Sequence, residues 1–290
     1  MSVSTTRESL DLTDDQIAQY HDEGMLVIED VFDADEVARM QAEADRILEL
    51  TINTSLATDR QNGRLDVVED DQGDQMIRKL QPVDDLSLTL SRIEQSIRAP
   101  IAALMDDEPR LMEEKLNYKA PLPEPVEWLD PARATSAFPV HNDWAYYQAQ
   151  DYPQSVLSTG IMVDDNTKES GPLHVWPGSH DHHREHQHVE DLGLQVPASE
   201  LEGRGHDVIA PAGSVIFFSS LLVHSSRPNA SGRPRRLMIY SHYPVGDGDH
   251  LTPDERNGPT RLRESPYEWE YQRMKDDGEF EDQFQAPTYE

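Results

Sequence analysis

The sequence predicts a mainly β fold with flanking helices, and three observations lead to this expectation. From about residue 111 the chain consists of short runs rich in branched and aromatic residues, separated by glycine, proline, asparagine or aspartate. Many short strands with turn residues between them are typical of an antiparallel sandwich or barrel. The first hundred residues contain apolar residues at helical spacing, which predicts helices that pack on one sheet. No internal repeat or linker is evident, so we expect one domain in this 290-residue chain.

The change in residue composition along the chain divides the expected domain into parts. We expect a polar, disordered tail over residues 1–11 and a single domain over 12–290. Within that domain we expect a helical part over about 12–110, a barrel over about 111–245 and a C-terminal arm over 246–290.

The segment "LTDDQIAQYHDEG" (12–24) carries the signals of a helix. Thr13 is placed to cap its start, and Gln16 is placed to complete a capping box. Gly24 supplies a C-terminal stop. The run "MLVIEDVF" (25–32) then predicts a short strand, because it is rich in branched residues.

A second helix is predicted over 33–50, where Asp33 and Glu36 have the spacing of another capping box. Phe32 and Val37 flank its start at the positions of a hydrophobic staple.

Residues 51–75 are polar and contain glycine, which indicates a mobile loop. The run "QMIRKLQPV" (75–83) resembles a strand. The segment 86–105 predicts a helix, since its apolar residues recur at three- and four-residue spacing. The loop and the helical part are expected to shape specificity, because binding segments are often of this kind.

The charge of the chain restricts its partners. Asp and Glu number 56 against 25 Lys and Arg, of which only five are lysines, and the formal net charge is −31. Such a surface repels phosphate backbones and anionic lipids, so we expect no nucleic-acid or membrane partner. A salt-adapted host explains a carboxylate-rich, lysine-poor surface, and an ordinary acidic cytosolic protein is the alternative.

Cysteine and long apolar runs are both missing from the sequence. The lack of cysteine excludes disulfides and thiolate-bound metals. No run approaches 18 apolar residues, and the N-terminus has no signal-peptide core. We therefore expect a cytoplasmic protein, and the sequence leaves its oligomeric state open.

The segment "FPVHNDWAYY" (138–147) raises the question of function. If it is a strand, His141 and Asp143 share one face and converge on one point. Two histidines and one carboxylate hold Fe(II) in non-haem oxygenases, and His224, after an apolar run and before a turn, is the candidate third ligand. A hydrogen-bonded surface pair would give the same pattern, so the residues alone leave both interpretations open.

Arg235 lies eleven residues beyond His224, at the mouth of the apolar strand "LMIYSHYPV". The planar guanidinium group there can hold a carboxylate through two parallel hydrogen bonds. An ion pair with a local Asp or Glu is the alternative role for this arginine.

Taken in order, these pieces resemble the phytanoyl-CoA dioxygenase family, which includes ectoine hydroxylase, within the Fe(II)/2-oxoglutarate oxygenases. The resemblance covers most of residues 12–245, and its motifs are specific in combination. They are "YKAP" at 118–121, "VHNDWAYY" at 140–147, "SGPLHVWPGSH" at 170–180 and "PAGSVIFFSSLLVHSSRPNASGRPRRLMIYSHY" at 211–243, with a weaker match in "LTDDQIAQYHDEGMLVIEDVF".

The resemblance implies a double-stranded β-helix, a jelly-roll (cupin-like) barrel with helices on one side. On that fold His141, Asp143 and His224 correspond to the iron ligands. Arg235 corresponds to the residue that binds the distal carboxylate of 2-oxoglutarate, with Ser226 as a second contact. The implied cofactors are Fe(II), 2-oxoglutarate and O2.

The family resemblance also implies a reaction class. Hydroxylation of an unactivated C–H bond in a small molecule would be coupled to the release of succinate and CO2. Halogenating relatives carry a small residue where this chain has Asp143, so the carboxylate favours hydroxylation. Arg236 is adjacent on the strand and would point to the opposite face from the cosubstrate. A catalytically silent jelly-roll binding protein, or a cupin-type metal enzyme that does not use 2-oxoglutarate, is the alternative.

Other polar and aromatic residues have weaker signals. The histidine-rich segment 180–188 predicts a solvated loop, with metal binding as the alternative. Tyr147 would share a strand face with Asp143 and is the candidate pocket wall. Lys119 could reach 2-oxoglutarate or an acidic substrate. The small amount of positive charge favours a small polar or zwitterionic substrate over an acyl-CoA, and the substrate itself is not defined by the sequence.

Overall fold

The computed structural model describes residues 10–69, 73–121, 132–133, 137–189, 193–201, 203, 205–251 and 265–287, so most of the predicted tail over 1–11 lies outside the described residues. The longer helices are α1 (Asp14–Glu23), α2 (Ala34–Thr58), α3 (Leu88–Ser96), α4 (Arg98–Met105), α5 (Trp144–Tyr147) and α6 (Pro266–Asp276). The strands are β1 (Met25–Ile28), β2 (Leu65–Glu69), β3 (Gln75–Leu80), β4 (Pro109–Pro121), β5 (Ala132–Arg133), β6 (Phe138–His141), β7 (Leu157–Met162), β8 (Leu173–Val175), β9 (Gln187–Val189), β10 (Gly193–Gln195), β11 (His206–Asp207), β12 (Val215–Ser219), β13 (His224–Ser226) and β14 (Leu237–Pro244).

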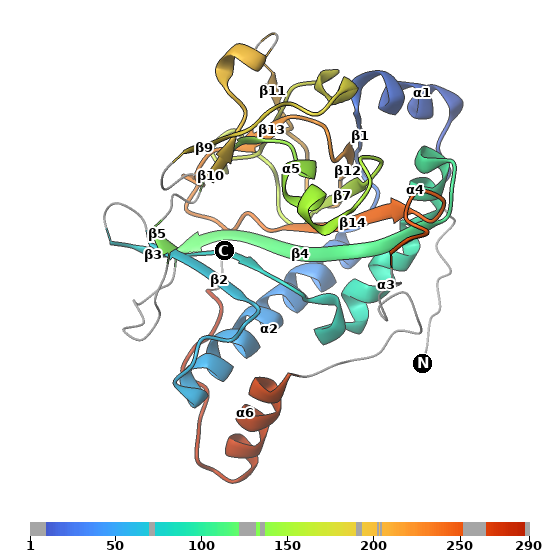
Figure 1. Cartoon of the computed structure of the whole chain (residues 1–290). Helices are drawn as coiled ribbons and strands as arrows, with labels where there is room; N and C mark the ends of the chain where they lie inside the picture. Colours follow the sequence, from blue (N-terminus) through green and yellow to red (C-terminus); the bar gives the residue numbers. More distant parts are fainter. Residues whose placement is uncertain are drawn as a thin grey trace.

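The strands form two main sheets with helices packed on the larger one. The large sheet has the order β1-β12-β7-β14-β4-β3-β2-β5, the small sheet has the order β11-β8-β13-β6, and β9 pairs with β10. In Figure 1, α2 and α3 lie below β4 while β11 and β13 lie above it. The jelly-roll fold with flanking helices is confirmed, but the two sheets are not closed into a barrel.

Alternation along β14 shows how the large sheet separates two cores. Met238 and Tyr240 belong to the cluster that contains the helix side chains, whereas Leu237 and Ile239 belong to the cluster between the two sheets. Successive side chains of a strand point to opposite faces, so one strand serves both cores. The candidate ligands His141, Asp143 and His224 share a cavity with Leu237 and Ile239 and so lie on the side between the sheets.

The N-terminal part begins as predicted. Thr13 and Gln16 form the capping box of α1, and Gly24 ends the helix in the left-handed conformation (φ 74°). A Cβ atom on Gly24 would lie 2.3 Å from the imidazole of His180, so the turn that contains His180 requires glycine here. The strands predicted within 25–32 and 75–83 are present as β1 and β3, and together with β2, which was not predicted, they belong to the large sheet.

The prediction of a loop over 51–75 is wrong. Helix α2 continues to Thr58, and β2 occupies Leu65–Glu69. Polar residues near the end of α2 are buried because the C-terminal segment packs there: the amide of Asn53 donates to the carbonyl of Phe284 at 2.8 Å and its oxygen accepts the Phe284 N–H at 3.0 Å. This contact joins residues more than 200 positions apart, so local sequence does not reveal it.

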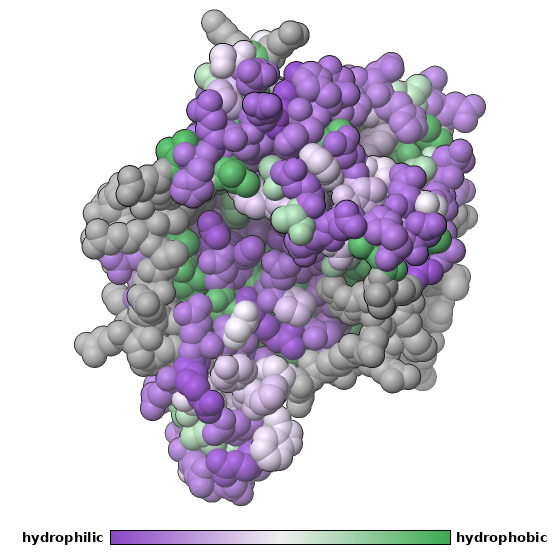
Figure 2. All heavy atoms as spheres, viewed as in Figure 1, coloured by the Kyte–Doolittle hydropathy of each residue, from purple (hydrophilic) through white to green (hydrophobic). Residues whose placement is uncertain are grey.

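The helix predicted over 86–105 is two helices, with a break at Ile97 between α3 and α4. Pro100 has no N–H to donate to the carbonyl four residues earlier, so a continuous helix is disfavoured. No helix in the described part of the chain is both long and apolar enough to cross a bilayer. The face drawn in Figure 2 is covered largely by hydrophilic residues, as the composition leads one to expect.

Candidate metal centre and cosubstrate pocket

Two neighbouring strands of the small sheet place His141 and His224 together. His141 ends β6 and His224 begins β13, and the two residues are direct partners across this antiparallel pair. Directly opposed side chains lie on the same face of a sheet. The two rings are therefore 4.3 Å apart, centroid to centroid, and both are buried.

Asp143 reaches the same point from a turn and not from a strand. The strand predicted over 138–147 ends at His141, and α5 begins at Trp144, whose N–H donates to the carbonyl of Ser220. The Oδ1 atom of Asp143 lies 3.5 Å from Nε2 of His141 and 3.7 Å from Nε2 of His224. One donor atom from each of the three residues lies within 4.8 Å of the others.

Backbone contacts orient both imidazoles for metal binding. Nδ1 of His141 is 2.6 Å from the carbonyl of Pro139, and Nδ1 of His224 is 2.9 Å from the carbonyl of Leu222. Because a carbonyl only accepts, each Nδ1 carries the hydrogen, and each Nε2 lone pair faces Asp143. This is the tautomer that a metal ligand needs.

The charge states also suit a divalent cation. Burial and the neighbouring His141 lower the pKa of His224 to about 4, although Asp143 raises it. Burial raises the pKa of Asp143, but the imidazoles and Lys115 outweigh it and hold that pKa well below its usual range. Ser158 donates to the other carboxylate oxygen at 3.3 Å. Two imidazoles with their Nε2 atoms directed at an ionised, supported carboxylate fit Fe(II).

Arg235 lies in the cavity beside these three residues. The cavity has a volume of about 60 Å³ and is lined by Lys115, Asn117, Phe138, His141, Asp143, Leu173, Phe218, His224, Ser226, Arg235, Leu237 and Ile239. Arg235 is 1% exposed, and its Nε and Nη2 atoms have no hydrogen-bond partner among the described residues. Burial lowers the pKa of Arg235 to about 10, although the charge of Asp164 raises it. A buried guanidinium with open donors fits a carboxylate of a bound molecule.

Comparison with known proteins decides the family. The family model "Phytanoyl-CoA dioxygenase (PhyH)" matches residues 20–237, which is more than half of the chain. This chain belongs to the phytanoyl-CoA dioxygenase family. The members of this family to which it is similar are Fe(II)- and 2-oxoglutarate-dependent oxygenases, so the chain is a dioxygenase of this class.

Individual relatives agree with this assignment. The dioxygenase is 29% identical to ectoine dioxygenase of Sphingopyxis alaskensis over 249 residues, which are 78% of this chain and 74% of the relative. It is 25% identical to a probable alpha-ketoglutarate-dependent hypophosphite dioxygenase of Stutzerimonas stutzeri, over 79% of this chain and 77% of the relative. The crystal structure of EctD from S. alaskensis with bound Fe has a TM-score of 0.62 at 23% identity and covers 91% of this chain and 92% of its own, which shows the shared fold.

Lys119 is a buried lysine that contacts Ser226, a residue that lines the cavity. Its side chain is fully buried, and Nζ donates to Ser226 Oγ at 2.7 Å and to the carbonyls of Gly171 and Arg227. Burial, together with the charges of Arg235 and Arg227, lowers the pKa of Lys119 to about 6. Sequence reasoning named Lys119 and Ser226 separately, and the structure brings them into contact.

The cavity that contains the three ligand candidates and Arg235 is called the metal cavity below. Tyr147 is not among the residues that line it. Tyr147 lies on the short helix α5 and not on the strand that was predicted for this segment. The hydroxyl group donates to Glu113 at 3.0 Å and lies 3.4 Å from Ser241 Oγ. Glu113 also accepts from Lys115 at 2.6 Å and from Gln81 at 2.9 Å, a network that motif reasoning missed because Glu113 belongs to no metal or arginine motif.

The histidine-rich segment 180–188 was predicted to be a solvated loop, but part of it packs against the protein. His183 and His186 stack at 5.3 Å with an interplanar angle of 10°. Both contact Asn142, the residue between two of the ligand candidates: His183 Nδ1 is 3.2 Å from its side-chain oxygen, and His186 Nε2 accepts its backbone N–H at 3.1 Å. The segment therefore packs against the turn that carries Asp143.

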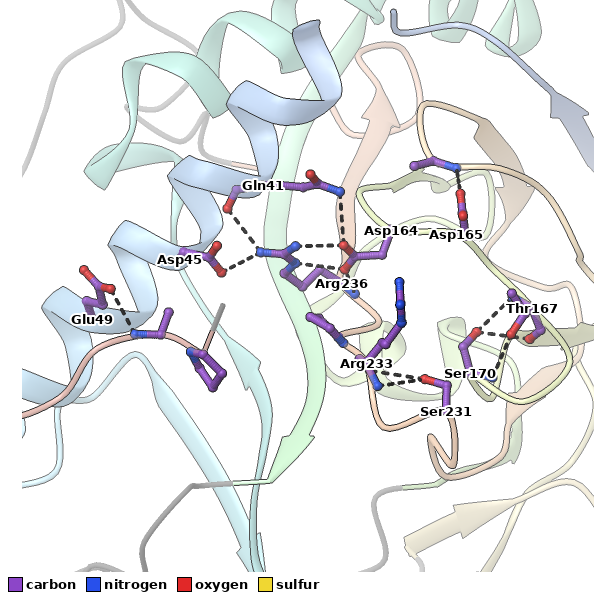
Figure 3. A pocket seen from close by; sticks show the side chains of 14 residues that line it. Gln41, Asp45, Glu49, Asp164, Asp165, Thr167, Ser170, Ser231, Arg233 and Arg236 are labelled. Atoms are coloured by element: carbon purple, nitrogen blue, oxygen red, sulfur yellow. Dashed lines mark hydrogen bonds and ion pairs between the residues drawn. The ribbon is translucent and has the colours of Figure 1, made fainter. Parts of the chain in front are cut away.

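Arg236 faces away from the metal cavity, as predicted. It lines a separate cavity of about 660 Å³ that lies between α2, the turn after β7 and the C-terminal segment, shown in Figure 3. Its guanidinium group bonds Asp164 through two nitrogens, at 2.8 and 2.7 Å, and Asp45 at 2.5 Å. These ion pairs raise the pKa of Arg236 against the effect of burial.

Proposed function

We propose that this dioxygenase hydroxylates an unactivated C–H bond of a small molecule, with 2-oxoglutarate converted to succinate and CO2. The observation that carries the proposal is the convergence of three ligands on one point beside a buried arginine with open donors. The relatives are named as dioxygenases of ectoine and hypophosphite, which are both small molecules.

His141, Asp143 and His224 are proposed to hold Fe(II). When bound, the iron with 2-oxoglutarate supplies the activation of O2 that no side chain of the chain can provide. Two histidines and one carboxylate would leave ligand positions open for cosubstrate and O2. A carboxylate at position 143 leaves no ligand position for a halide, which supports hydroxylation over halogenation.

Arg235, Lys119 and Ser226 are proposed to hold 2-oxoglutarate. Arg235 would bind the distal carboxylate through two parallel hydrogen bonds, and Ser226 would contribute a hydroxyl group. Lys119, which has no carboxylate partner among the described residues, would supply a second positive charge. Residues that fix the cosubstrate in this way would orient it toward the iron and exclude water from its binding site.

Oxygen-dependent formation of succinate from 2-oxoglutarate tests the proposal. The expected result is turnover by the wild-type protein with Fe(II), increased by a true substrate found in a screen of small molecules. Asp143→Ala is expected to lose turnover, and Arg235→Met to require much more 2-oxoglutarate. A wild-type protein with no turnover would indicate a silent binding protein. Metal-dependent activity that is independent of the keto acid and unchanged in Arg235→Met would indicate a cupin-type enzyme.

The domain boundaries remain part of the proposal. We propose one domain over 12–290 because residues of the C-terminal arm pack on α2: Arg60 near the end of α2 forms an ion pair with Glu270 of α6 at 2.7 Å. Limited proteolysis that releases the arm without loss of the unfolding transition would contradict it.

A further inference from the structure

Lysine is scarce in this chain and is concentrated at one place. Only five lysines occur in a chain of net charge −31. Three of them, Lys79, Lys115 and Lys119, lie on the adjacent strands β3 and β4. Lys119 belongs to the proposed cosubstrate site, which leaves Lys79 and Lys115 without an assigned role.

A β-bulge brings Lys79 to the same side of the sheet as the metal cavity. Ile77 and Leu80 both belong to the core on the helix side, and the pairing of β3 shifts between Ile77 and Lys79. The extra residue of a bulge re-aims the side chains next to it. Lys79 is thereby the direct partner of Asn117, a residue that lines the metal cavity.

Arg78, the residue at the bulge, extends the positive charge toward the metal site. Its guanidinium group lies 5.6 Å from the ring centroid of Phe138, which also lines the cavity. Asp66, opposite Lys79 on β2, pairs with Arg78 at 2.8 Å. The cavity side of β3 thus carries two consecutive cations, of which Arg78 already has a carboxylate.

Three cations, Arg78, Lys79 and Lys115, lie near two carboxylates, those of Asp66 and Glu113. Lys115 pairs with Glu113, and Arg78 pairs with Asp66, whereas Lys79 has no hydrogen bond or ion pair in the described part of the chain. Burial and the charges of Lys115 and Arg78 lower the pKa of Lys79, although the carboxylates of Asp66 and Glu113 raise it. A partly buried ammonium group without a carboxylate is costly, and an anion beside it would relieve that cost.

We propose that Lys79 and Lys115 bind an oxoanion of the substrate, a carboxylate or a phosphonate, and so hold the rest of the molecule over the metal centre. Lys115 lines the cavity together with His141 and Asp143, so an anion bound there is adjacent to the reacting position. This inference rests on the proposed function, and it narrows the substrate class from small polar molecules to small acids and zwitterions.

Calorimetric titration of the anaerobic Fe(II)·2-oxoglutarate protein tests the inference. The probes are small carboxylates and phosphonates, each paired with a neutral derivative, such as L-proline with L-prolinamide and methylphosphonate with its dimethyl ester. At least one acid is expected to bind ten times more tightly than its neutral partner, and the two arms show which oxoanion is preferred. Lys79→Met is expected to weaken that binding at least tenfold.

Two further variants keep the result interpretable. Lys115→Met combined with Glu113→Gln removes the second ammonium group without leaving its carboxylate unpaired, and Lys168→Met removes an exposed lysine as the matched control. The inference is contradicted if no acid binds, if acid and neutral partner bind equally, or if both lysine variants keep the wild-type affinity. The visible band of the Fe(II)·2-oxoglutarate complex, recorded on the same samples, reports failure of the proposed function separately.

Discussion

Two consecutive arginines, Arg235 and Arg236, immediately precede β14, face opposite sides of the large sheet and differ in their contacts and in the direction of their pKa shifts. Arg236 faces α2 and is held by Asp164 and Asp45. Arg235 faces the metal cavity, and two of its nitrogens have no partner among the described residues. Burial lowers the pKa of Arg235, while ion pairs raise the pKa of Arg236.

Polar groups on the two faces of the large sheet differ in a similar way, although Thr159 Oγ1 and His242 Nδ1 on the helix side also lack a partner among the described residues. On the helix side, the hydroxyl group of Tyr240 donates to the Leu90 carbonyl at 2.7 Å, and His242 lies 2.8 Å from Glu94. On the cavity side, two guanidinium nitrogens of Arg235 are buried without a partner among the described residues. A satisfied polar group stabilises the fold, whereas an unsatisfied buried one destabilises it until a ligand binds. The helix side is therefore expected to govern stability and the cavity side to govern binding.

The largest expected effect on stability is that of Arg236→Met. Removal of this guanidinium leaves Asp164 buried without its ion pair, and breaking such a pair costs about 3 kcal/mol of unfolding free energy when one partner is half exposed. Urea unfolding measures the change. Affinity for 2-oxoglutarate at a temperature where the variant is folded should equal that of the wild type. A stability loss below about 1 kcal/mol would show that the two faces do not differ as described.

Ser158 and Thr159 provide a matched pair on β7. Ser158 supports the carboxylate of Asp143, so Ser158→Ala is expected to weaken Fe(II) affinity by about tenfold, as is usual for groups that orient metal ligands. Thr159 is buried on the other face, and its hydroxyl group has no partner in the described part of the chain. Thr159→Val should leave iron affinity unchanged and stability equal or higher. Equal iron affinity in both variants would remove the distinction.

The pH dependence of 2-oxoglutarate affinity tests the role of Lys119. Its pKa is about 6 in the free protein, and a bound carboxylate favours the charged form, so binding takes up a proton above pH 6. The dissociation constant is expected to rise from pH 6.5 to 8, by at most about tenfold per pH unit. Lys119→Met should abolish this slope.

A second consequence concerns stability, and its sign follows from the same shift. The folded pKa of Lys119 lies below the usual value of 10.5, so the unfolded chain binds more protons between pH 6 and 10.5. The contribution of Lys119 to unfolding free energy therefore rises with pH in that window.

The binding experiment has its own contradicting result. If the dissociation constant of 2-oxoglutarate falls as pH rises, or if Lys119→Met keeps the pH dependence of the wild type, the proton belongs to another group.

The smallest expected effect is that of Tyr240→Phe on the helix side. The change leaves the Leu90 carbonyl without its donor and should cost about 1 kcal/mol of unfolding free energy. Affinity for 2-oxoglutarate should not change, because the hydroxyl group points away from the cavity. Measurement of both quantities on one preparation checks that the helix side does not contribute to binding.

Local chemistry made part of the fold predictable. The capping boxes of α1 and α2 and the glycine stop of α1 depend on residues within one turn of each other, and all three are confirmed. The C-terminal end of α2 was missed because Asn53 is buried by a segment over 200 residues away. The break before α4 depends on Pro100, whose effect on a helical pattern was overlooked.

The candidate site was predictable only in its residue types. The positions of His141, Asp143, His224 and Arg235 follow from motifs, and the structure brings them into one cavity. The two histidines meet because β6 and β13 pair in a register that sets His141 opposite His224. These residues are 83 positions apart, so the pairing has no local signature in the sequence. The bulge that turns Lys79 toward the cavity is equally invisible, since strict alternation would place it with Ile77.

The most direct test of the central claim is the visible charge-transfer band of Fe(II) and 2-oxoglutarate, recorded without oxygen in the wild type and in His224→Ala, Arg235→Met and Arg236→Met. The wild type should show the band and His224→Ala should lack it. Arg235→Met should need about a hundredfold more 2-oxoglutarate, which corresponds to about 2.7 kcal/mol of binding, while folded Arg236→Met should titrate as the wild type does. A band retained in His224→Ala, or equal titrations for the two arginine variants, would contradict the account.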